Sequence, residues 1–186
     1  MLGEPNEDSN MIFKSTTLKD AMLVELERRG DARGFFARTF CADEFEKAGL
    51  PTEYVQQNTS FSANKGTLRG MHFQNSPHAE DKLIRCIRGG IVDIIIDLRP
   101  DSPSYCKWEA FELNEDNKHQ LLVPKGFAHG FQTLTDNVEV TYLVTHRYTP
   151  SAEGGVRWDD PAFGITWPLD VTEISPKDAA WPAFEG

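Results

Sequence analysis

The sequence lacks a cysteine pattern, a long apolar run and an excess of positive charge. Its 186 residues hold only Cys41, Cys86 and Cys106, an odd number without a CxxC pair. We therefore expect free buried thiols in a reducing cytoplasm. The longest apolar run, at residues 91–96, contains Asp93 and is far shorter than the ~20 residues that cross a bilayer.

Several familiar binding motifs are also missing. No GxGxxG or P-loop sequence is present, so nucleotide binding by either route is unsupported. No HxH or HExxH pair occurs among the five histidines, which are His72, His78, His119, His129 and His146. A metal site would therefore require contacts made only in the fold.

The first ten residues, MLGEPNEDSN, are polar and acidic and lack the apolar core of a secretory signal. We expect residues 1–10 to be a disordered leader, with Met11 a candidate natural start. The formal net charge of −10 argues against attraction to nucleic acid or to an anionic membrane. The net negative charge repels a phosphate ester, so binding one would require a few arginines close to the ligand.

Short β-branched runs separated by turn residues dominate from about residue 54 to residue 149. Residues 91–98 (IVDIIIDL) follow residues 82–88 (KLIRCIR) across Gly89-Gly90, a pair typical of a hairpin turn. Further strands are predicted at residues 108–113, 119–124 and 138–145. Turns at such short intervals, with little helical periodicity, predict an all-β sandwich, jelly roll or barrel.

One helix is predicted, over residues 42–48, with two acidic residues near its start and Gly49 as its stop. A proline-rich tail is expected to pack across the barrel as ordered coil, and its prolines are Pro161, Pro168, Pro176 and Pro182. The length fits one compact domain, placed at residues 11–186.

Two polar residues on predicted strands are candidates for chemistry. His72 lies in TLRGMHFQ beside Arg69, and its ordinary alternative is a hydrogen-bonded core histidine. Lys82 opens an otherwise apolar strand, and its alternative is a solvated strand end.

Two further candidates lie within apolar strands. A carboxylate at Asp93 is costly to bury without a partner, and an ion pair with Arg85 or Arg88 would be the structural explanation. Tyr142 shares a strand face with three valines because side chains alternate with period two, so its phenol points into an apolar interior. Core packing with a satisfied hydroxyl is the alternative there.

These candidates lie in segments that resemble the dTDP-4-dehydrorhamnose 3,5-epimerase family, over residues 11–184. The segments are DARGFFARTF (31–40), VQQNTS (55–60), GTLRGMHFQ (66–74), DKLIRCIRGGIVDIIIDLR (81–99), VPKGFAHGF (123–131), TYLVTHRY (141–148), WDDPAFGITWP (158–168) and ISPKDAAWP (174–182). The pair LRGMHFQ and GFAHGF is highly specific.

The resemblance implies an all-β, cupin-type jelly-roll β-barrel with short peripheral helices that forms a homodimer. It implies an isomerase with no metal or nucleotide cofactor that binds a nucleotide sugar in the barrel mouth. The substrate would be an NDP-4-keto-6-deoxyhexose of the dTDP-4-dehydro-6-deoxyglucose type, inverted at carbon 3, carbon 5 or both, in the biosynthesis of a rhamnose-like deoxysugar.

The resemblance also assigns roles. His72 is similar to the general base, and Asp178 in SPKD to the carboxylate that orients it. Lys82 resembles the lysine that faces the ketone oxygen, with Asp93 nearby, and Tyr142 resembles the general acid across the sugar ring. Four residues match positions that contact the phosphate or the base, namely Arg33, Gln56, Asn58 and Arg69. Two further residues match positions that line the pocket, His129 and Tyr148.

The chemistry explains why such groups are needed together. A hydrogen next to a ketone is too weakly acidic to leave unaided, and a neutral imidazole has a pKa close to working pH. The resulting enolate requires a nearby cation, and inversion requires a proton from the opposite face.

Two features do not fit simply. Arg69 and His72 have opposite parity in an ideal strand, so either Gly70 permits a bulge that re-aims one of them or an arginine serves a neighbouring subunit's site. Arg38 stands where many family members have a glutamate. This indicates an exposed surface change, a different nucleotide such as CDP, or a subfamily with altered epimerisation scope.

Other functions remain open on the sequence alone. They are a 3-only or 5-only epimerase acting on a CDP-sugar, a non-catalytic sugar-nucleotide-binding cupin, and a metal-dependent cupin oxygenase or isomerase. The sequence does not decide the nucleotide base, the number of carbons inverted or the final deoxysugar.

Overall fold

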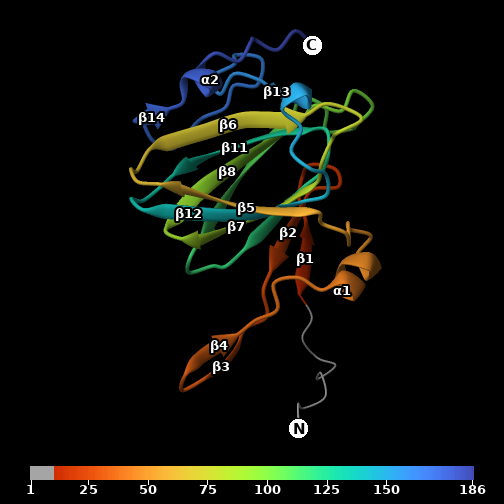
Figure 1. Cartoon of the computed structure of the whole chain (residues 1–186), viewed down its shortest axis with the longest axis vertical. Helices are drawn as coiled ribbons and strands as arrows, with labels where there is room; N and C mark the ends of the chain where they lie inside the picture. Colours follow the sequence, from red (N-terminus) through yellow and green to blue (C-terminus); the bar gives the residue numbers. More distant parts are fainter. Residues whose placement is uncertain (1–10) are drawn as a thin grey trace.

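Strands with apolar inner faces form two antiparallel sheets that enclose the core. The computed structural model describes residues 11–186, so the prediction for residues 1–10 lies outside the described residues. The first sheet has the order β1 (Ile12–Ser15), β2 (Met22–Glu25), β10 (Gln120–Val123), β7 (Lys82–Arg88), β12 (Val138–Val144) and β5 (Gln56–Ser62). Figure 1 shows this sheet below the second one.

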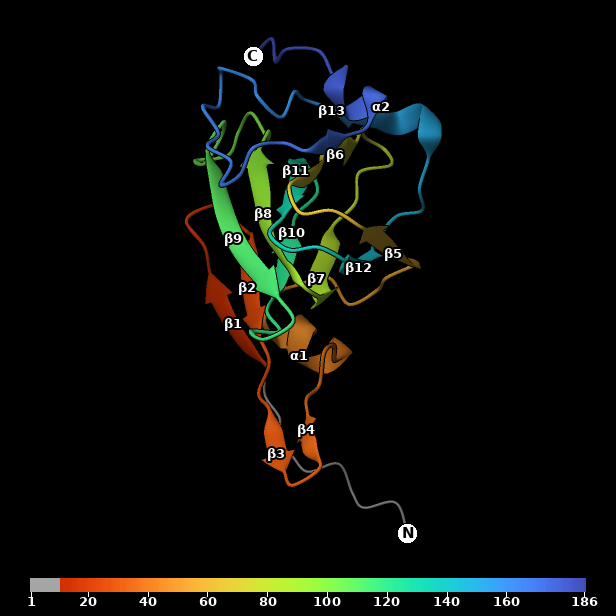
Figure 2. The same cartoon turned by 90° about the vertical axis from the view of Figure 1, so that its left-hand side faces the viewer.

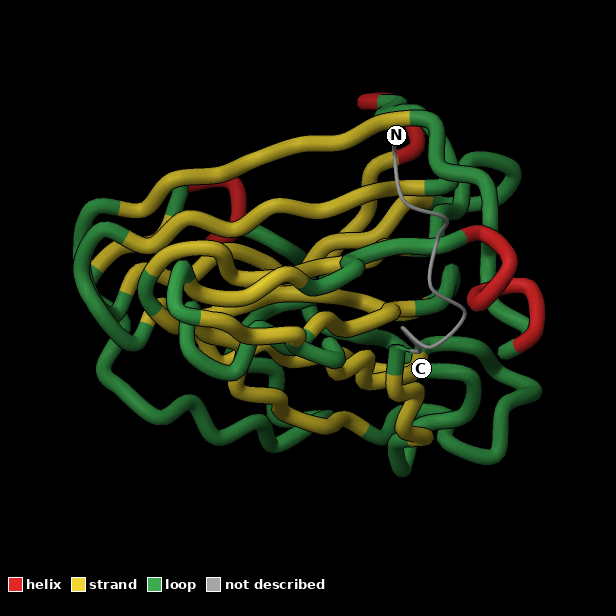
Figure 3. The backbone as a smooth tube through the Cα atoms, turned by 90° about the horizontal axis from the view of Figure 1, so that it is seen from below, coloured by secondary structure: helices red, strands yellow, loops and turns green. Residues whose placement is uncertain are grey.

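The second sheet has the order β13 (Glu153–Gly155), β6 (Thr67–Gln74), β11 (Phe127–Thr133), β8 (Gly90–Asp97) and β9 (Trp108–Asn114). A short strand, β14 (Glu173–Ile174), pairs with β6 in parallel. Figure 3 shows strands making up most of the body of the molecule, with only short helical segments. This two-sheet arrangement confirms the predicted all-β jelly roll.

The core between the sheets comes from alternate residues of facing strands. Ile84 of β7 and Val140 of β12 meet Ile91 and Ile95 of β8 in one buried cluster. The other face of β8 is buried as well, since Ile94 and Ile96 lie beneath the C-terminal tail. Burial on both faces explains why this strand reads as a continuous apolar run.

The tail packs on the outside of the second sheet, as predicted. Its aromatic residues Phe163, Trp167 and Phe184 contact the outer cluster that contains Ile94 and Ile96. Part of the tail is helical, because α2 (Pro176–Ala179) begins at one of the four prolines. Proline is favoured at the first position of a helix, where its missing N–H costs no hydrogen bond.

The predicted hairpin at Gly89-Gly90 is wrong. Strand β7 pairs with β10 and β12 in the first sheet, whereas β8 pairs with β9 and β11 in the second. The turn therefore carries the chain from one sheet to the other. Gly89 has φ +71°, and this conformation serves any tight corner, so the dipeptide marks a turn without specifying which strands pair.

The predicted helix is present as α1 (Ala42–Lys47). Gly49, with φ +72°, ends it and donates its N–H to the carbonyl of Glu46. The buried Phe45 packs on the outer face of the first sheet, against Leu83 and Leu122. A 3-10 turn, η1 (Pro150–Ala152), precedes β13.

The four strands before α1 were not predicted. Besides β1 and β2 they include β3 (Arg29–Asp31) and β4 (Gly34–Phe36), which form a separate hairpin. Figures 1 and 2 show this hairpin extending away from the two sheets. Strands of three or four residues are too short to give a period-two signal. We call residues 29–36 the arm.

The cysteines carry no disulfide bond in the structure, as expected. Cys86 is buried, whereas Cys41 and Cys106 are only partly buried. Within residues 11–186, no helix is both long and apolar enough to cross a bilayer.

Candidate active site

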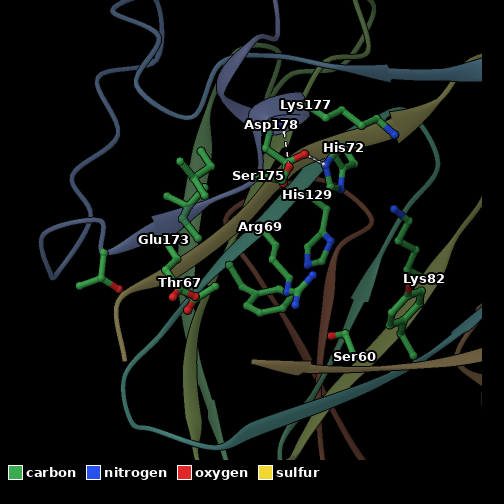
Figure 4. Close-up of a pocket in the computed structure, with 15 residues that line it drawn as sticks. Ser60, Thr67, Arg69, His72, Lys82, His129, Glu173, Ser175, Lys177 and Asp178 are labelled. Carbon is green, nitrogen blue, oxygen red and sulfur yellow. Dashed lines mark hydrogen bonds and ion pairs between the residues drawn. The ribbon is translucent and has the colours of Figure 1, made fainter. Parts of the chain in front are cut away.

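A cavity of about 860 Å³ opens between the two sheets. It is lined by polar side chains from both sheets and from the C-terminal segment, among them Arg69, His72, Lys82, His129, Tyr142 and Asp178. Figure 4 shows Arg69, His72 and Lys82 approaching this space from different sides. Six of the sequence-predicted residues therefore meet here.

His72 lies on β6 and is held by a carboxylate. Its Nε2 lies 2.7 Å from Oδ1 of Asp178, which approaches from α2 (Figure 4). Nε2 is the donor when the imidazole is neutral and Asp178 is ionised, and Nδ1 then carries the lone pair. This hydrogen bond fixes the orientation of the ring and leaves a basic nitrogen for a ligand.

Asp178 is itself held in place by the backbone. Its Oδ2 accepts the N–H of Gly70 at 3.1 Å, and its own N–H donates to the Ser175 hydroxyl at 3.0 Å. Burial by itself would raise the pKa of Asp178, but the hydrogen bonds from His72 and Gly70 outweigh it and hold the pKa below its usual value. Asp178 is therefore ionised at neutral pH, as a partner of an imidazole must be.

Tyr142 and Lys82 reach the cavity from the first sheet. Since His72 lies on the second sheet, the imidazole and the phenol approach the same space from opposite walls. The pKa of Tyr142 is raised, mainly by burial and then by the charge of Glu80. Lys82 lies 3.2 Å from Glu80 through an ion pair that is mostly buried, so it is not a solvated strand end.

Asp93 lies deeper than expected. It is fully buried, and its Oδ2 is 2.9 Å from Nε2 of His129, which lines the cavity. The suggested ion pair with Arg85 or Arg88 is wrong, because period two places Asp93 inside the barrel beside His129. Among the described residues the second carboxylate oxygen has no hydrogen-bond partner.

The parity conflict between Arg69 and His72 is resolved within one chain. The pairing of β11 with β6 shifts register between His129 and Phe131, next to Gly70. Gly70 has φ +135°, and a Cβ there would lie 2.5 Å from the Cα of Gly130. The local irregularity turns both side chains into the cavity, so the bulge explanation holds.

Three predicted nucleotide-contacting or lining residues surround a second cavity of about 290 Å³, namely Gln56, Asn58 and Tyr148. This cavity shares His72, Lys82 and Tyr142 with the first, so the two adjoin at the candidate catalytic groups. Gln56 donates to Asn58 at 2.9 Å, which fixes both amides. Tyr148 is half exposed at the rim and offers a flat aromatic surface.

Arg33 lies elsewhere. It is on the arm, its side chain is 89% exposed, and it lines neither cavity. Its guanidinium pairs with Asp31 at 2.5 Å. Arg38, the departure from the family pattern, forms a partly buried ion pair with Glu44 at 2.8 Å, which ties the segment before α1 to that helix.

Four charged residues that line the cavities are absent from the sequence prediction, namely Glu80, Glu153, Glu173 and Lys177. Glu153 accepts hydrogen bonds from Tyr148 at 2.9 Å and from Lys177 at 2.5 Å. Lys177 precedes Asp178 directly, and that adjacency was the available sequence signal. Within the described residues, no group of three or more His, Cys, Asp or Glu side chains is arranged to hold a metal ion.

Comparison with known proteins identifies close relatives. The sequence profile of the family described as "dTDP-4-dehydrorhamnose 3,5-epimerase" matches residues 15–186. A protein of that name from Sinorhizobium fredii is 43% identical over 179 residues, which are 96% of this chain and 92% of the relative.

Solved structures agree. A dTDP-4-dehydrorhamnose 3,5-epimerase from Bacillus anthracis, with TDP and PPi bound, matches with a TM-score of 0.91 and 43% identity, over 94% of this chain and 99% of that one. A dTDP-6-deoxy-D-glucose-3,5-epimerase from Legionella pneumophila, in complex with dTDP-4-keto-L-rhamnose, matches with a TM-score of 0.88 and 37% identity, over 94% and 93%.

Proposed function

This chain belongs to the dTDP-4-dehydrorhamnose 3,5-epimerase family, and on that premise we propose how its cavity inverts the ketosugar of a nucleotide sugar. It is an isomerase that acts on an NDP-4-keto-6-deoxyhexose in deoxysugar biosynthesis. The observation that carries the proposal is the placement of His72 and Tyr142 on opposite walls of one cavity.

His72 takes the first proton. With Nε2–H donated to Asp178, the Nδ1 lone pair removes the hydrogen from carbon 3 or carbon 5, next to the ketone. Asp178 stays ionised and stabilises the imidazolium that forms, because its carboxylate already accepts bonds from His72 and Gly70.

Lys82 stabilises the enolate. Removal of the proton moves negative charge onto the carbon 4 oxygen, and the Lys82 ammonium supplies a fixed positive charge beside it. The ion pair with Glu80 orients that ammonium before substrate arrives. A preorganised group of this kind contributes about 3–4 kcal/mol to transition-state stabilisation.

Tyr142 returns a proton on the other face. Because burial and Glu80 raise its pKa, the phenol remains protonated at neutral pH and can act as a general acid. Because this proton arrives from the wall opposite His72, the configuration at the carbon is inverted. Each inversion leaves His72 protonated and Tyr142 ionised, and proton exchange with solvent restores both groups. Proton transfers alone therefore complete the reaction, and the mechanism requires no metal or nucleotide cofactor.

The nucleotide lies along the remaining polar residues. Arg69 offers a guanidinium to the diphosphate, and Gln56 and Asn58 offer amides in the second cavity. Tyr148 provides a ring for stacking on the base at the rim. His129 binds the sugar from the cavity wall, and Asp93 fixes its orientation from below.

We take dTDP as the nucleotide, supported by the dTDP-sugar and TDP in the related structures. CDP is the alternative raised by Arg38. The partly buried ion pair between Arg38 and Glu44 favours a structural role for that arginine. The setting is the cytoplasm, with neither nucleic acid nor membrane as a partner.

A homodimer explains the position of Arg33. The arm exposes Phe35 and Phe36, which are 50% and 66% accessible, and it lies away from the cavities of its own chain. Arg28 holds its base by donating to the carbonyl of Asn117 at 3.0 Å and by lying over the Phe35 ring. An arm held outward with two exposed aromatic rings fits a second copy, in which Arg33 reaches the partner's nucleotide.

The test is exchange of carbon-bound hydrogen with solvent. The protein is incubated in heavy water with dTDP- or CDP-4-keto-6-deoxyglucose, and deuterium at carbons 3 and 5 is followed by NMR. Deuterium at one or both carbons of the dTDP-sugar is expected, and the labelled positions report a single or double epimerisation. His72→Ala is expected to abolish exchange at either carbon.

The alternatives predict different results. A non-catalytic binding protein would bind the nucleotide sugar but exchange nothing, and its His72→Ala variant would keep its affinity. Exchange only with the CDP-sugar would overturn the choice of dTDP. Exchange at an undiminished rate in His72→Ala would remove the assigned base.

A further inference from the structure

Gln132 takes no part in the chemistry above, yet it is a fully buried polar side chain. It lies on β11, and both ends of its amide bind the C-terminal tail. Nε2 donates to the carbonyl of Leu169 at 2.9 Å, and Oε1 accepts the N–H of Leu169 at 3.1 Å. A buried amide satisfied by one backbone position fixes the register of that backbone.

The next residues of the tail are held by the turn between β5 and β6. Thr172 donates its N–H to the carbonyl of Gly66 at 3.1 Å and its hydroxyl to the carbonyl of Lys65 at 2.7 Å. A Cβ on Gly66 would lie 2.9 Å from the carbonyl of Asp170, so the tail approaches this turn closely. We call the contacts of Gln132 and Thr172 the tail clamp.

The tail clamp leads directly to the catalytic carboxylate. After Thr172, β14 pairs with the start of β6, and Ser175 then caps the short helix that carries Asp178. The Asp178 carboxylate must form hydrogen bonds with Nε2 of His72 at 2.7 Å and with the N–H of Gly70 at 3.1 Å. A four-residue helix within a coil cannot hold such a position by itself, since helices this short are unstable alone.

We infer that Gln132 is a positioning residue for the reaction, which acts by fixing the tail so that Asp178 reaches His72. Gln132 contacts neither cavity; its effect passes through Leu169, β14 and α2. The inference rests on the proposed function, because it requires that Asp178 support His72 in catalysis.

The matched control is Gln120, another buried glutamine bound to coil backbone. It is 2% exposed, lies on β10 in the other sheet, and donates to the carbonyl of Thr39 at 2.8 Å. Gln132→Met and Gln120→Met therefore make the same chemical change at similar depth. Only the first touches the tail.

The experiment measures kcat, KM and melting temperature of the purified full-length variants with a dTDP-4-keto-6-deoxyglucose substrate. We expect Gln132→Met to lower kcat about tenfold and to change KM less than about twofold. A displaced Asp178 no longer orients His72, which slows proton abstraction but leaves nucleotide binding intact. Gln120→Met is expected to keep kcat within about twofold at a similar loss of melting temperature. Equal kcat losses in the two variants would overturn the inference.

A double-mutant cycle with Asp178→Asn separates the inference from the proposed function. If Gln132 acts through Asp178, Gln132→Met is expected to lower kcat no further in the Asp178→Asn background. Independent, multiplying losses would overturn the inference alone. An Asp178→Asn variant with full kcat would instead overturn the assigned role of Asp178.

Thr172→Val keeps the inference testable if Gln132→Met does not fold. It removes the hydroxyl bond to Lys65 at a largely exposed site with little change in volume. A loss of kcat of about threefold that disappears in the Asp178→Asn background is expected. An unchanged kcat for Thr172→Val would count against the tail clamp in that case.

Discussion

At the scale of single residues, the proposed base His72 and the proposed acid Tyr142 lie on opposite walls of the cavity. His72 is held by a hydrogen bond from its Nε2 to Asp178, while the pKa of Tyr142 is raised by burial and by Glu80. Base and acid are thus distinguished by side-chain chemistry and by environment. This separation makes their roles individually testable.

Tyr142→Phe is expected to separate exchange from inversion. The variant keeps His72, Asp178 and Lys82, so deuterium still enters the substrate, but no acid remains on the opposite wall and inversion falls about 10²–10⁴-fold. NMR in heavy water measures both processes in one sample. Full inversion by the variant would remove Tyr142 from its role.

A second residue-level prediction concerns acid stability. Burial alone would raise the pKa of Asp97, but hydrogen bonds from Arg99, Ser102 and Ser104 outweigh it and lower the pKa to about 2. Because this folded value lies below the ordinary 3.8, ionised Asp97 stabilises the fold above pH 3.8, by about 2 kcal/mol. That contribution is lost as the pH falls from 3.8 towards 2.

Urea unfolding between pH 2 and pH 7 measures the contribution of ionised Asp97 to the free energy of unfolding. Asp97→Asn is expected to reduce stability at pH 7 and to flatten the fall in stability below pH 4. Asp101→Asn changes an exposed carboxylate nearby and serves as the control. A variant at Asp97 whose acid profile matches the wild type would show that this network does not set the profile.

At the scale of elements, the tail depends on a close approach to β13. A Cβ on Gly155 would lie 2.3 Å from the Trp181 ring and 2.7 Å from the carbonyl of Met71. Trp181 in turn meets the His72 ring edge-on, with centroids 6.1 Å apart. Gly155 therefore allows the tail to lie directly over β6, the strand that carries His72.

Gly155→Ala is expected to displace Trp181 and the adjoining α2, which lowers kcat about tenfold or more and costs about 1–3 kcal/mol of stability. Gly164→Ala is the control in the same tail, since its Cβ would meet nothing within 4 Å and only its backbone, with φ +60°, is strained. Steady-state kinetics and thermal melting compare the two. Similar kcat values for both would argue against a role for this packing.

At the scale of the whole molecule, the proposed dimer makes each active site a product of two chains. His72 and Arg33 of one chain would then serve different sites. The two single variants His72→Ala and Arg33→Ala are each expected to be defective, but a mixed dimer would contain one site with both residues intact.

Mixing equal amounts of the two variants after dissociation is expected to restore about one quarter of wild-type activity, because half of the dimers are mixed and each has one intact site. Activity is followed with the dTDP-sugar at limiting concentration, and size-exclusion chromatography confirms the dimer. No gain on mixing would place Arg33 in the site of its own chain or outside the site altogether.

Patterns of apolar residues in the sequence predict where the strands lie but not which strands pair. The runs at residues 82–88, 91–98 and 138–145 predicted β7, β8 and β12 closely, because side-chain alternation and turn residues are local properties. The prediction of a hairpin at Gly89-Gly90 is wrong because strand pairing, unlike strand position, is not a local property of the sequence. Choice of partner strand depends on which faces are buried by distant segments.

The sequence by itself determined the family, the jelly-roll class and the residue types that the chemistry requires, since these follow from motifs and local periodicity. Only the tertiary structure decided that Asp93 supports His129, that Arg69 and His72 share a cavity, and that the β3–β4 arm, which contains Arg33, extends outward. Hydrogen bonds and burial between residues far apart in the chain are created by packing, so no local pattern encodes them.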